Sequence, residues 1–187
     1  PAIGLGAQFN SANSIFDDPK RISIMKTNLL LRLLSFGMLL SGIWLDSSPV
    51  SAASTIPVTS TVDSLADDGQ CSLREAVIAA NTDTAAGGCP AGSGADTIVF
   101  DPSLPLPAIF TLTLTGANED NSASGDLDLT GILTIQGSDT GQIIIDGNSM
   151  DRVFDIRPGA TVTISTLIIQ NGNPGSGANG GGIIVTG

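Results

Sequence analysis

Apolar and polar residues alternate in short runs through most of the chain after Gly94. In the longest run, Phe110, Leu112 and Leu114 are separated by threonines. A period of two is typical of a β-strand with one buried face. Shorter runs of the same kind occur at Leu127/Leu129, Leu133/Ile135, Ile143/Ile145, Phe154/Ile156, Val162/Ile164, Leu167/Ile169 and Ile183/Val185. Gly, Asn and Asp lie between the runs, where turns are needed, so the pattern predicts an all-β region.

The runs recur at regular spacings, which favours stacked strands. Leu112/Leu114, Leu133/Ile135 and Phe154/Ile156 follow one another at a constant spacing, and IIIDGN (143–148) recurs as IIQNGN (168–173) at a slightly longer one. A repeat of about 20 to 25 residues suits one coil of a parallel β-helix. We therefore expect residues 97–187 to form the first coils of a right-handed parallel β-helix that continues past Gly187. A β-sandwich is the alternative.

One helix is predicted ahead of the strands, over residues 72–81. Ser72 and Glu75 have the spacing of a capping box. An apolar stripe follows at helical spacing, made by Leu73, Ala76, Val77 and Ala80. Asn81 is the expected end of the helix.

The position of this helix indicates a capping role. A solenoid exposes the edges of its terminal strands, and its end coil needs a cover with a polar outer face. We expect the helix to place its apolar stripe on the first coil, within an N-terminal cap over residues 53–96. Arg74 and Glu75 are expected to face outward or to form local ion pairs.

Residues 25–52 have the three parts of a secretory signal peptide. Lys26 and Arg32 supply positive charge, the uncharged run 33–45 supplies an apolar core, and small residues up to Ala52 fit a cleavage site. The uncharged run is too short for a membrane-spanning helix, which needs about 20 apolar residues. We therefore expect an extracellular or cell-surface protein without a membrane span after cleavage. Residues 1–24 show no periodic apolar pattern and are interpreted as an upstream, disordered extension.

The region after the predicted signal is strongly acidic. It contains many Asp and Glu residues but only three basic residues, which are Arg74, Arg152 and Arg157. Such a surface repels nucleic-acid phosphates and anionic membranes. Nucleic-acid binding is therefore excluded as a function.

The two cysteines of the chain, Cys71 and Cys89, both follow the predicted signal. Two thiols in an exported segment most simply form a disulfide, and this one would tether the start of the helix. A zinc site is not expected, because the chain has no histidine and no further cysteine.

The segment CSLREA, from Cys71 to Ala76, resembles the N-terminal motif of the CSLREA family of secreted bacterial proteins. The resemblance continues through VIAAN (77–81), GADTIVF (94–100), GDLDL (125–129), RVFDI (152–156) and GATVTIS (159–165). It implies a pectin-lyase-like parallel β-helix in a large surface or secreted protein, similar to polymorphic outer-membrane and adhesin-like proteins. Thr166 stands where the family usually has glycine, and this departure bears on the tightness of that turn.

Carboxylates are the main candidates for chemistry in the strand region. Two pairs could serve glycoside hydrolysis, namely Asp126/Asp128 and Asp151/Asp155. A calcium site could be formed by Asn118, Glu119, Asp120, Asp126 and Asp128. The simpler interpretation is that these side chains lie on solvated strand faces and turns, and we predict no catalytic residue and no cofactor. Arg157 is expected at a turn, because Pro158 and Gly159 follow it.

A sugar-binding module is a further alternative. Such sites usually offer exposed aromatic rings, but the exported part has no Trp or Tyr, and Phe100, Phe110 and Phe154 take inward positions. Contacts with surface glycans or proteins would then involve coils beyond Gly187. The sequence thus predicts a non-catalytic, structural or adhesin-like β-helix module. The alternative function is the N-terminal fragment of a carbohydrate-active lyase or hydrolase.

Overall fold

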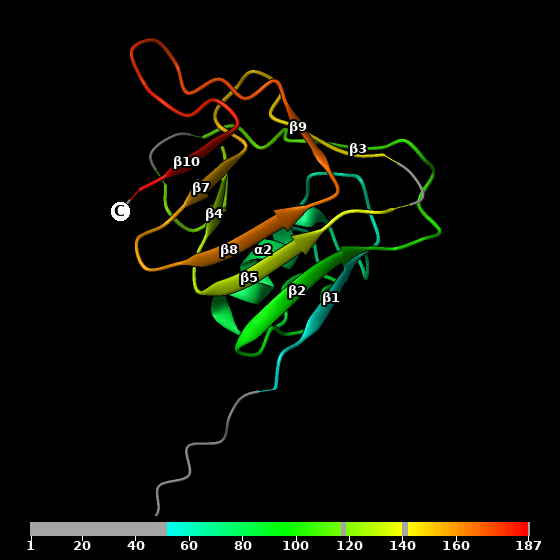
Figure 1. Cartoon of the computed structure of the whole chain (residues 1–187). Coiled ribbons are helices and arrows are strands. Elements are labelled where there is room, and N and C mark those ends of the chain that lie inside the picture. The colour runs from blue at the N-terminus through cyan, green and yellow to red at the C-terminus, as the bar shows by residue number, and fades with distance from the viewer. Residues whose placement is uncertain (1–51, 117–118, 140–141, 187) are drawn as a thin grey trace, which may run out of the picture. The chain divides into compact units, whose positions relative to one another are not determined.

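The computed structural model describes residues 52–116, 119–139 and 142–186, which form ten strands and one helix (Figure 1). In chain order these are β1 Thr55–Val58, α2 Leu73–Thr82, β2 Ala95–Phe100, β3 Ala108–Thr111, β4 Leu127–Leu129, β5 Ile132–Gln136, β6 Ile143–Asp146, β7 Phe154–Ile156, β8 Thr161–Ser165, β9 Ile168–Gln170 and β10 Ile183–Val185. The predicted upstream extension and nearly all of the predicted signal peptide lie outside the described residues. Within the described ranges, no helix is long and apolar enough to cross a membrane.

The strands form three parallel sheets. Sheet I has the order β1-β2-β5-β8, sheet II has β3-β6-β9, and sheet III has β4-β7-β10. After β1, the chain therefore visits the three sheets in turn, three times (Figure 1). The sandwich of antiparallel sheets that the sequence left open is excluded for the described strands, because every ladder between them is parallel.

The stacked strands do not follow the constant spacing seen in the sequence. In sheet I, Ile98 pairs with Ile135 and Ile135 with Ile164, so the two intervals along the chain are unequal. The runs 133–135 and 154–156, which belong to the regular series, lie in different sheets, I and III. The regular repeat is therefore wrong as a measure of stacking, because the connections between strands vary in length.

The core lies between the sheets and is filled from alternate strand positions. In sheet III, Leu129 is fully buried, Ile156 stacks on it and is partly exposed, and Val185 follows with 70% of its surface exposed. Burial decreases along this column because, among the described residues, no strand pairs with the far edges of β8, β9 and β10. Most of the core therefore belongs to the first two rounds of strands and to α2.

Helix α2 forms at the predicted place with the predicted capping box. Ser72 Oγ accepts a hydrogen bond from Glu75 N at 3.2 Å, and Glu75 Oε2 accepts one from Ser72 N at 2.9 Å. The disulfide Cys71–Cys89 is present and joins the residue before the N-cap to the turn after the helix. These local interactions fix the start of α2.

The end of α2 differs from the prediction. The helix continues through Asn81 to Thr82 and ends at Asp83, which has a left-handed φ of 52°. Asn81 instead joins α2 to the end of β4, because its Nδ2 donates to Asp128 O at 2.7 Å and its Oδ1 accepts from Thr130 N at 3.0 Å.

Arg74 is fully buried and does not face outward, but it forms an ion pair within the cap, which was the other expected arrangement. Its Nε and Nη2 donate to the two carboxylate oxygens of Asp63 at 2.6 and 3.1 Å, and this is its one ion pair among the described residues. The remaining donors reach backbone carbonyls of a loop before β4, which are those of Ser122, Gly125 and Asp126. All five N–H groups of the guanidinium are thus satisfied, which is the condition for burying a charge.

Asp63 completes this buried pair. Its Oδ2 also accepts hydrogen bonds from Thr113 N and Leu114 N, at 2.7 and 3.0 Å. Burial opposes the ionised carboxylate, but the hydrogen bonds from Arg74 and from these two amides hold the pKa of Asp63 below its ordinary value. Asp63 therefore binds Arg74 as a carboxylate at neutral pH.

Glu75 is also buried instead of facing outward, with 2% of its surface exposed. Its carboxylate packs against Gly87, where any side chain would collide with it. Gly87 also has a φ of 52°, a conformation that glycine adopts without strain. A side chain at this position would therefore displace the Glu75 carboxylate from its place beside the start of α2.

Replacing Arg74 with methionine should destabilise the fold by about 3 to 5 kcal/mol, because it leaves a buried carboxylate unpaired. Urea denaturation at pH 7, followed by circular dichroism, measures the loss. The double variant Asp63→Asn/Arg74→Met should recover part of it, and no recovery would contradict the pairing. Arg152→Met is the control, since its ion pairs, at 3.7 and 3.9 Å, are long, and it should cost less than about 1 kcal/mol.

Thr166, between β8 and β9, has a left-handed φ of 57°. This conformation costs a residue with a Cβ roughly 1 to 2 kcal/mol. Thr166→Gly should therefore stabilise the fold by about 1 kcal/mol, after allowance for the greater freedom of glycine in the unfolded chain. Thr163→Gly, within β8, should destabilise it instead. Equal losses in the two variants, measured by urea denaturation, would show that the turn is not strained.

Candidate functional site

Sheet III carries a group of nearly buried carboxylates on the side that faces away from the core. Asp128 in β4 and Asp155 in β7 are register partners and alternate with core residues, and Asp126 precedes β4. Their exposed fractions are 0% for Asp128, 6% for Asp126 and 7% for Asp155. The structure thus brings together acids that the sequence offered as two separate pairs.

Arg157 supplies positive charge to this acidic cluster. Its Nη1 lies 2.8 Å from Asp120 Oδ1, 3.1 Å from Asp155 Oδ2 and 3.7 Å from Asp128 Oδ1. The arginine follows β7 at the predicted turn, where Ala160 N donates to its carbonyl. One guanidinium therefore balances carboxylates from three segments of the chain.

Arg152 lies near the other end of the cluster but is held less closely. Its Nη1 is 3.7 Å from Asp151 Oδ1 and 3.9 Å from Asp126 Oδ2. Both distances exceed the hydrogen-bond range. The negative charge of an ionised Asp126 is therefore less well balanced by a nearby arginine than that of Asp155.

Ser122, which no sequence pattern indicated, fixes the loop over Asp128. Its backbone N donates to Asp128 Oδ2 at 3.0 Å, its Oγ donates to Asp128 O at 3.0 Å, and Asp128 N donates back to that Oγ at 2.8 Å. Ser122 is fully buried and has a φ of 59°. A serine within an acidic stretch carries no periodic signal, so only the folded arrangement reveals this role.

Of the residues proposed as calcium ligands, Glu119, Asp120 and Asp128 are engaged by protein groups, whereas the Asp126 carboxylate, where the structure describes its surroundings, has only its long contact with Arg152. The Glu119 carboxylate accepts hydrogen bonds from Asn121 N and Ser124 N, and Asp120 pairs with Arg157. Asn118 lies outside the described residues. In the described part of the chain, no group of three or more His, Cys, Asp or Glu side chains is arranged to hold a metal ion. The positive charge in this cluster comes from arginine.

Burial, together with the nearby carboxylates of Asp151, Asp128 and Asp155, raises the pKa of Asp126 to about 7 against the weaker effect of Arg152. Burial also raises the pKa of Asp128 to about 6, against the hydrogen bond from the neighbouring serine amide. A carboxyl group that is protonated near neutral pH can donate a proton, as a general acid must. The cluster therefore contains one group with suitable acidity for that step.

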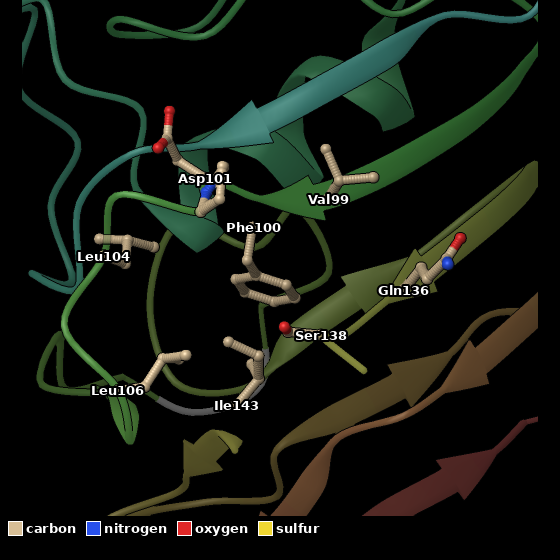
Figure 2. Close-up of a pocket in the computed structure, with 10 residues that line it drawn as sticks. Val99, Phe100, Asp101, Leu104, Leu106, Gln136, Ser138 and Ile143 are labelled. Atoms are coloured by element: carbon tan, nitrogen blue, oxygen red, sulfur yellow. The ribbon is translucent and has the colours of Figure 1, made fainter. Parts of the chain in front are cut away.

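A second feature is a hollow of about 190 Å³ at the ends of β2 and β5 (Figure 2). Its lining includes Phe100, Leu104, Leu106, Gln136, Ser138 and Ile143. Phe100 was expected in the core, but it is only partly buried, and its ring lies 4.9 Å from that of Phe110. The ring therefore joins the core to the hollow.

Asp126→Asn should gain stability relative to the original chain as the pH rises from about 4 to about 7. In that window the unfolded state loses the Asp126 proton while the folded state keeps it, so the original chain loses stability as the pH rises. The relative gain should be at least about 1.4 kcal/mol, which corresponds to one pKa unit. Urea denaturation at pH 4, 6 and 8 measures it.

Asp146→Asn is the matched control for this series. Although burial opposes ionisation there, hydrogen bonds from Asn148, Gln170 and Asn171 lower the pKa of Asp146 below 3.8. Its effect on stability should therefore be constant between pH 4 and 8. A constant effect of Asp126→Asn over the same range would contradict the raised pKa.

Comparison of the chain with protein-family models, with curated proteins and with solved structures finds no match.

Proposed function

We propose that residues 53–187 form the N-terminal cap and first coils of a right-handed parallel β-helix in a secreted or cell-surface protein. In this proposal the module is structural or adhesin-like and has no catalytic role. The observation that carries the proposal is the strand order, in which each of three parallel sheets gains one strand at every passage of the chain. A chain that winds in stacked coils produces this order.

The position of α2 supports the capping role. The helix contacts β2 and β4, which belong to the first passage of the chain through the three sheets. It also contacts β1, which pairs with the outer edge of β2. Leu73, Ala76 and Val77 of its apolar stripe are buried there. A helix that covers the start of the stack would protect strand ends that otherwise invite pairing with other chains.

Two features support export. The segment 25–52 has the charge, apolar core and small residues of a signal peptide. The Cys71–Cys89 bridge is of a kind that persists in oxidising compartments.

The contacts in the acidic cluster support a structural role for it. Arg157 lies against the carboxylates of Asp128 and Asp155, and Ser122 N donates to the carboxylate of Asp128. One observation favours the second candidate function, a carbohydrate-active lyase or hydrolase. The pKa of Asp126 is raised to about 7, so that a large fraction of this group keeps its proton near neutral pH, and the charges of Asp151 and Asp128 contribute to the rise. This arrangement meets one requirement of glycoside hydrolysis.

Expression of the full chain in a bacterial host, followed by fractionation, tests the export part of the proposal. The exported protein should begin at Ala53 and should contain no free thiol by mass analysis. Leu39→Arg interrupts the apolar run and should retain the chain in the cell, whereas the matched change Leu39→Ile should not. Free thiols in the exported protein, or retention of both variants, would contradict the proposal.

A crystal structure of the exported protein tests the fold, with right-handed stacked coils as the expected result. The same protein should not degrade polygalacturonate. Turnover that disappears in Asp126→Asn would establish the enzymatic alternative in place of the structural one.

A further inference from the structure

Sheet I carries a row of threonines on the side that faces away from the core. In register across the sheet, the row consists of Thr55, Thr97, Thr134 and Thr163. Neighbouring strands lie about 4.7 to 4.9 Å apart, and threonine is stiff at χ1, so the hydroxyls repeat at a nearly fixed spacing. Among the described residues, none of these four hydroxyls has a hydrogen-bond partner. Each is therefore available to a ligand.

This face carries no charge. The positions beside the threonine row are Ala95, Ile132 and Thr161 on one side and Pro57, Val99, Gln136 and Ser165 on the other. Asp96, the one charged residue in the strands of sheet I, takes an inward position and is 2% exposed. The part of the chain that follows the predicted signal peptide is strongly acidic as a whole, and its basic residues are three arginines. Its field repels polyanions, and the face offers no carboxylate to a polycation, so the charge pattern fits a neutral partner.

The face continues into the hollow shown in Figure 2. Val99 and Gln136 are register partners, and both line the hollow. The Phe100 ring projects into it beside Ile143 and Ser138. Its volume of about 190 Å³ is below the range of about 300 to 1,000 Å³ for drug-sized ligands and suits a single small ring.

We propose that the outward face of sheet I and this hollow bind a neutral polysaccharide. One sugar ring packs its apolar face on Phe100, as aromatic rings accept C–H groups on their negative face. Thr97 and Thr134 lie two positions before Val99 and Gln136, or about 7 Å along the strands, and meet the hydroxyls of the following sugar. The inference goes beyond the proposed function, because it places a binding surface within these first strands.

The test uses the exported chain with its disulfide intact and isothermal titration calorimetry. The probes are cellohexaose, xylohexaose, mannohexaose and chitohexaose, with hexagalacturonate as the acidic counterpart. At least one neutral probe should bind, with the same affinity at low salt and at about 0.5 M NaCl, since binding without charge pairs is not screened by salt. Hexagalacturonate should not bind. Absence of binding by all four neutral probes would overturn the proposal.

Two variants locate the site. Thr97→Val/Thr134→Val removes two hydroxyls with little change of shape and should weaken binding by about 10-fold, as expected for two lost hydrogen bonds. Phe100→Leu removes the ring and should weaken it by at least as much. The matched control Thr111→Val, in sheet II, should leave the affinity unchanged.

Two outcomes with these variants would overturn the assignment. One is binding that survives both the threonine and the Phe100 changes. The other is self-association that the threonine variant abolishes, which would assign the face to a second copy of the chain. Circular dichroism of each variant confirms that it is folded, so either result would leave the proposed fold and export unaffected.

Discussion

The buried guanidinium of Arg74 connects parts of the molecule that no strand ladder joins. It binds Asp63 ahead of the helix and three carbonyls of the loop before β4, and Asp63 in turn holds the backbone that follows β3. A buried charge is stable only when its partners are in place, so α2, the loop and the Asp63 segment form together. Each of these segments lies outside the three sheets, and the pair ties all three together, in addition to the bonds that Asn81 and Ser122 make to β4 and its end.

The acidic cluster depends on the same interaction. Asp126 lies between two arginines, because its carbonyl accepts from Arg74 while its carboxylate lies near Arg152. Arg74 thereby fixes the backbone that carries Asp126 and, through the same loop, the backbone of Ser122. The raised pKa values of Asp126 and Asp128, whose largest cause is burial, are thus a consequence of how the cap closes over β4.

Local patterns in the sequence predicted local structure well. The capping box needs only Ser72 and Glu75, and the alternation of Leu127 and Leu129 needs only one strand. Longer patterns were less reliable. IIIDGN and IIQNGN do mark stacked strands, β6 and β9, but Ile144 pairs with Ile168, one position away from the register of the matching letters. Connections of unequal length explain both this shift and the failure of the regular repeat.

The parts of the site that the sequence could not predict depend on distant partners. Arg74 and Glu75 look like an exposed pair on a helix, and the acceptors from the loop that bury Arg74 are separated from it by 48 to 52 positions along the chain. Residue type identified Asp126 and Asp128 as candidates but not that Arg157 and Ser122 would hold Asp128. Phe100 was assigned to the core by alternation, which does not show where a strand ends and a hollow begins.

The separation between Arg74 and its acceptors has a consequence for the order of assembly. In a chain that crosses a membrane N-terminus first, as proposed here, Asp63 and Arg74 emerge well before the loop at 122–126. The bridge between Cys71 and Cys89 closes over a sequence separation of only 18, so it can form during that interval. The guanidinium gains its last three acceptors only when that loop has followed. The cap would therefore close in two stages, in which the disulfide forms first and the buried hydrogen bonds of Arg74 form when the loop arrives.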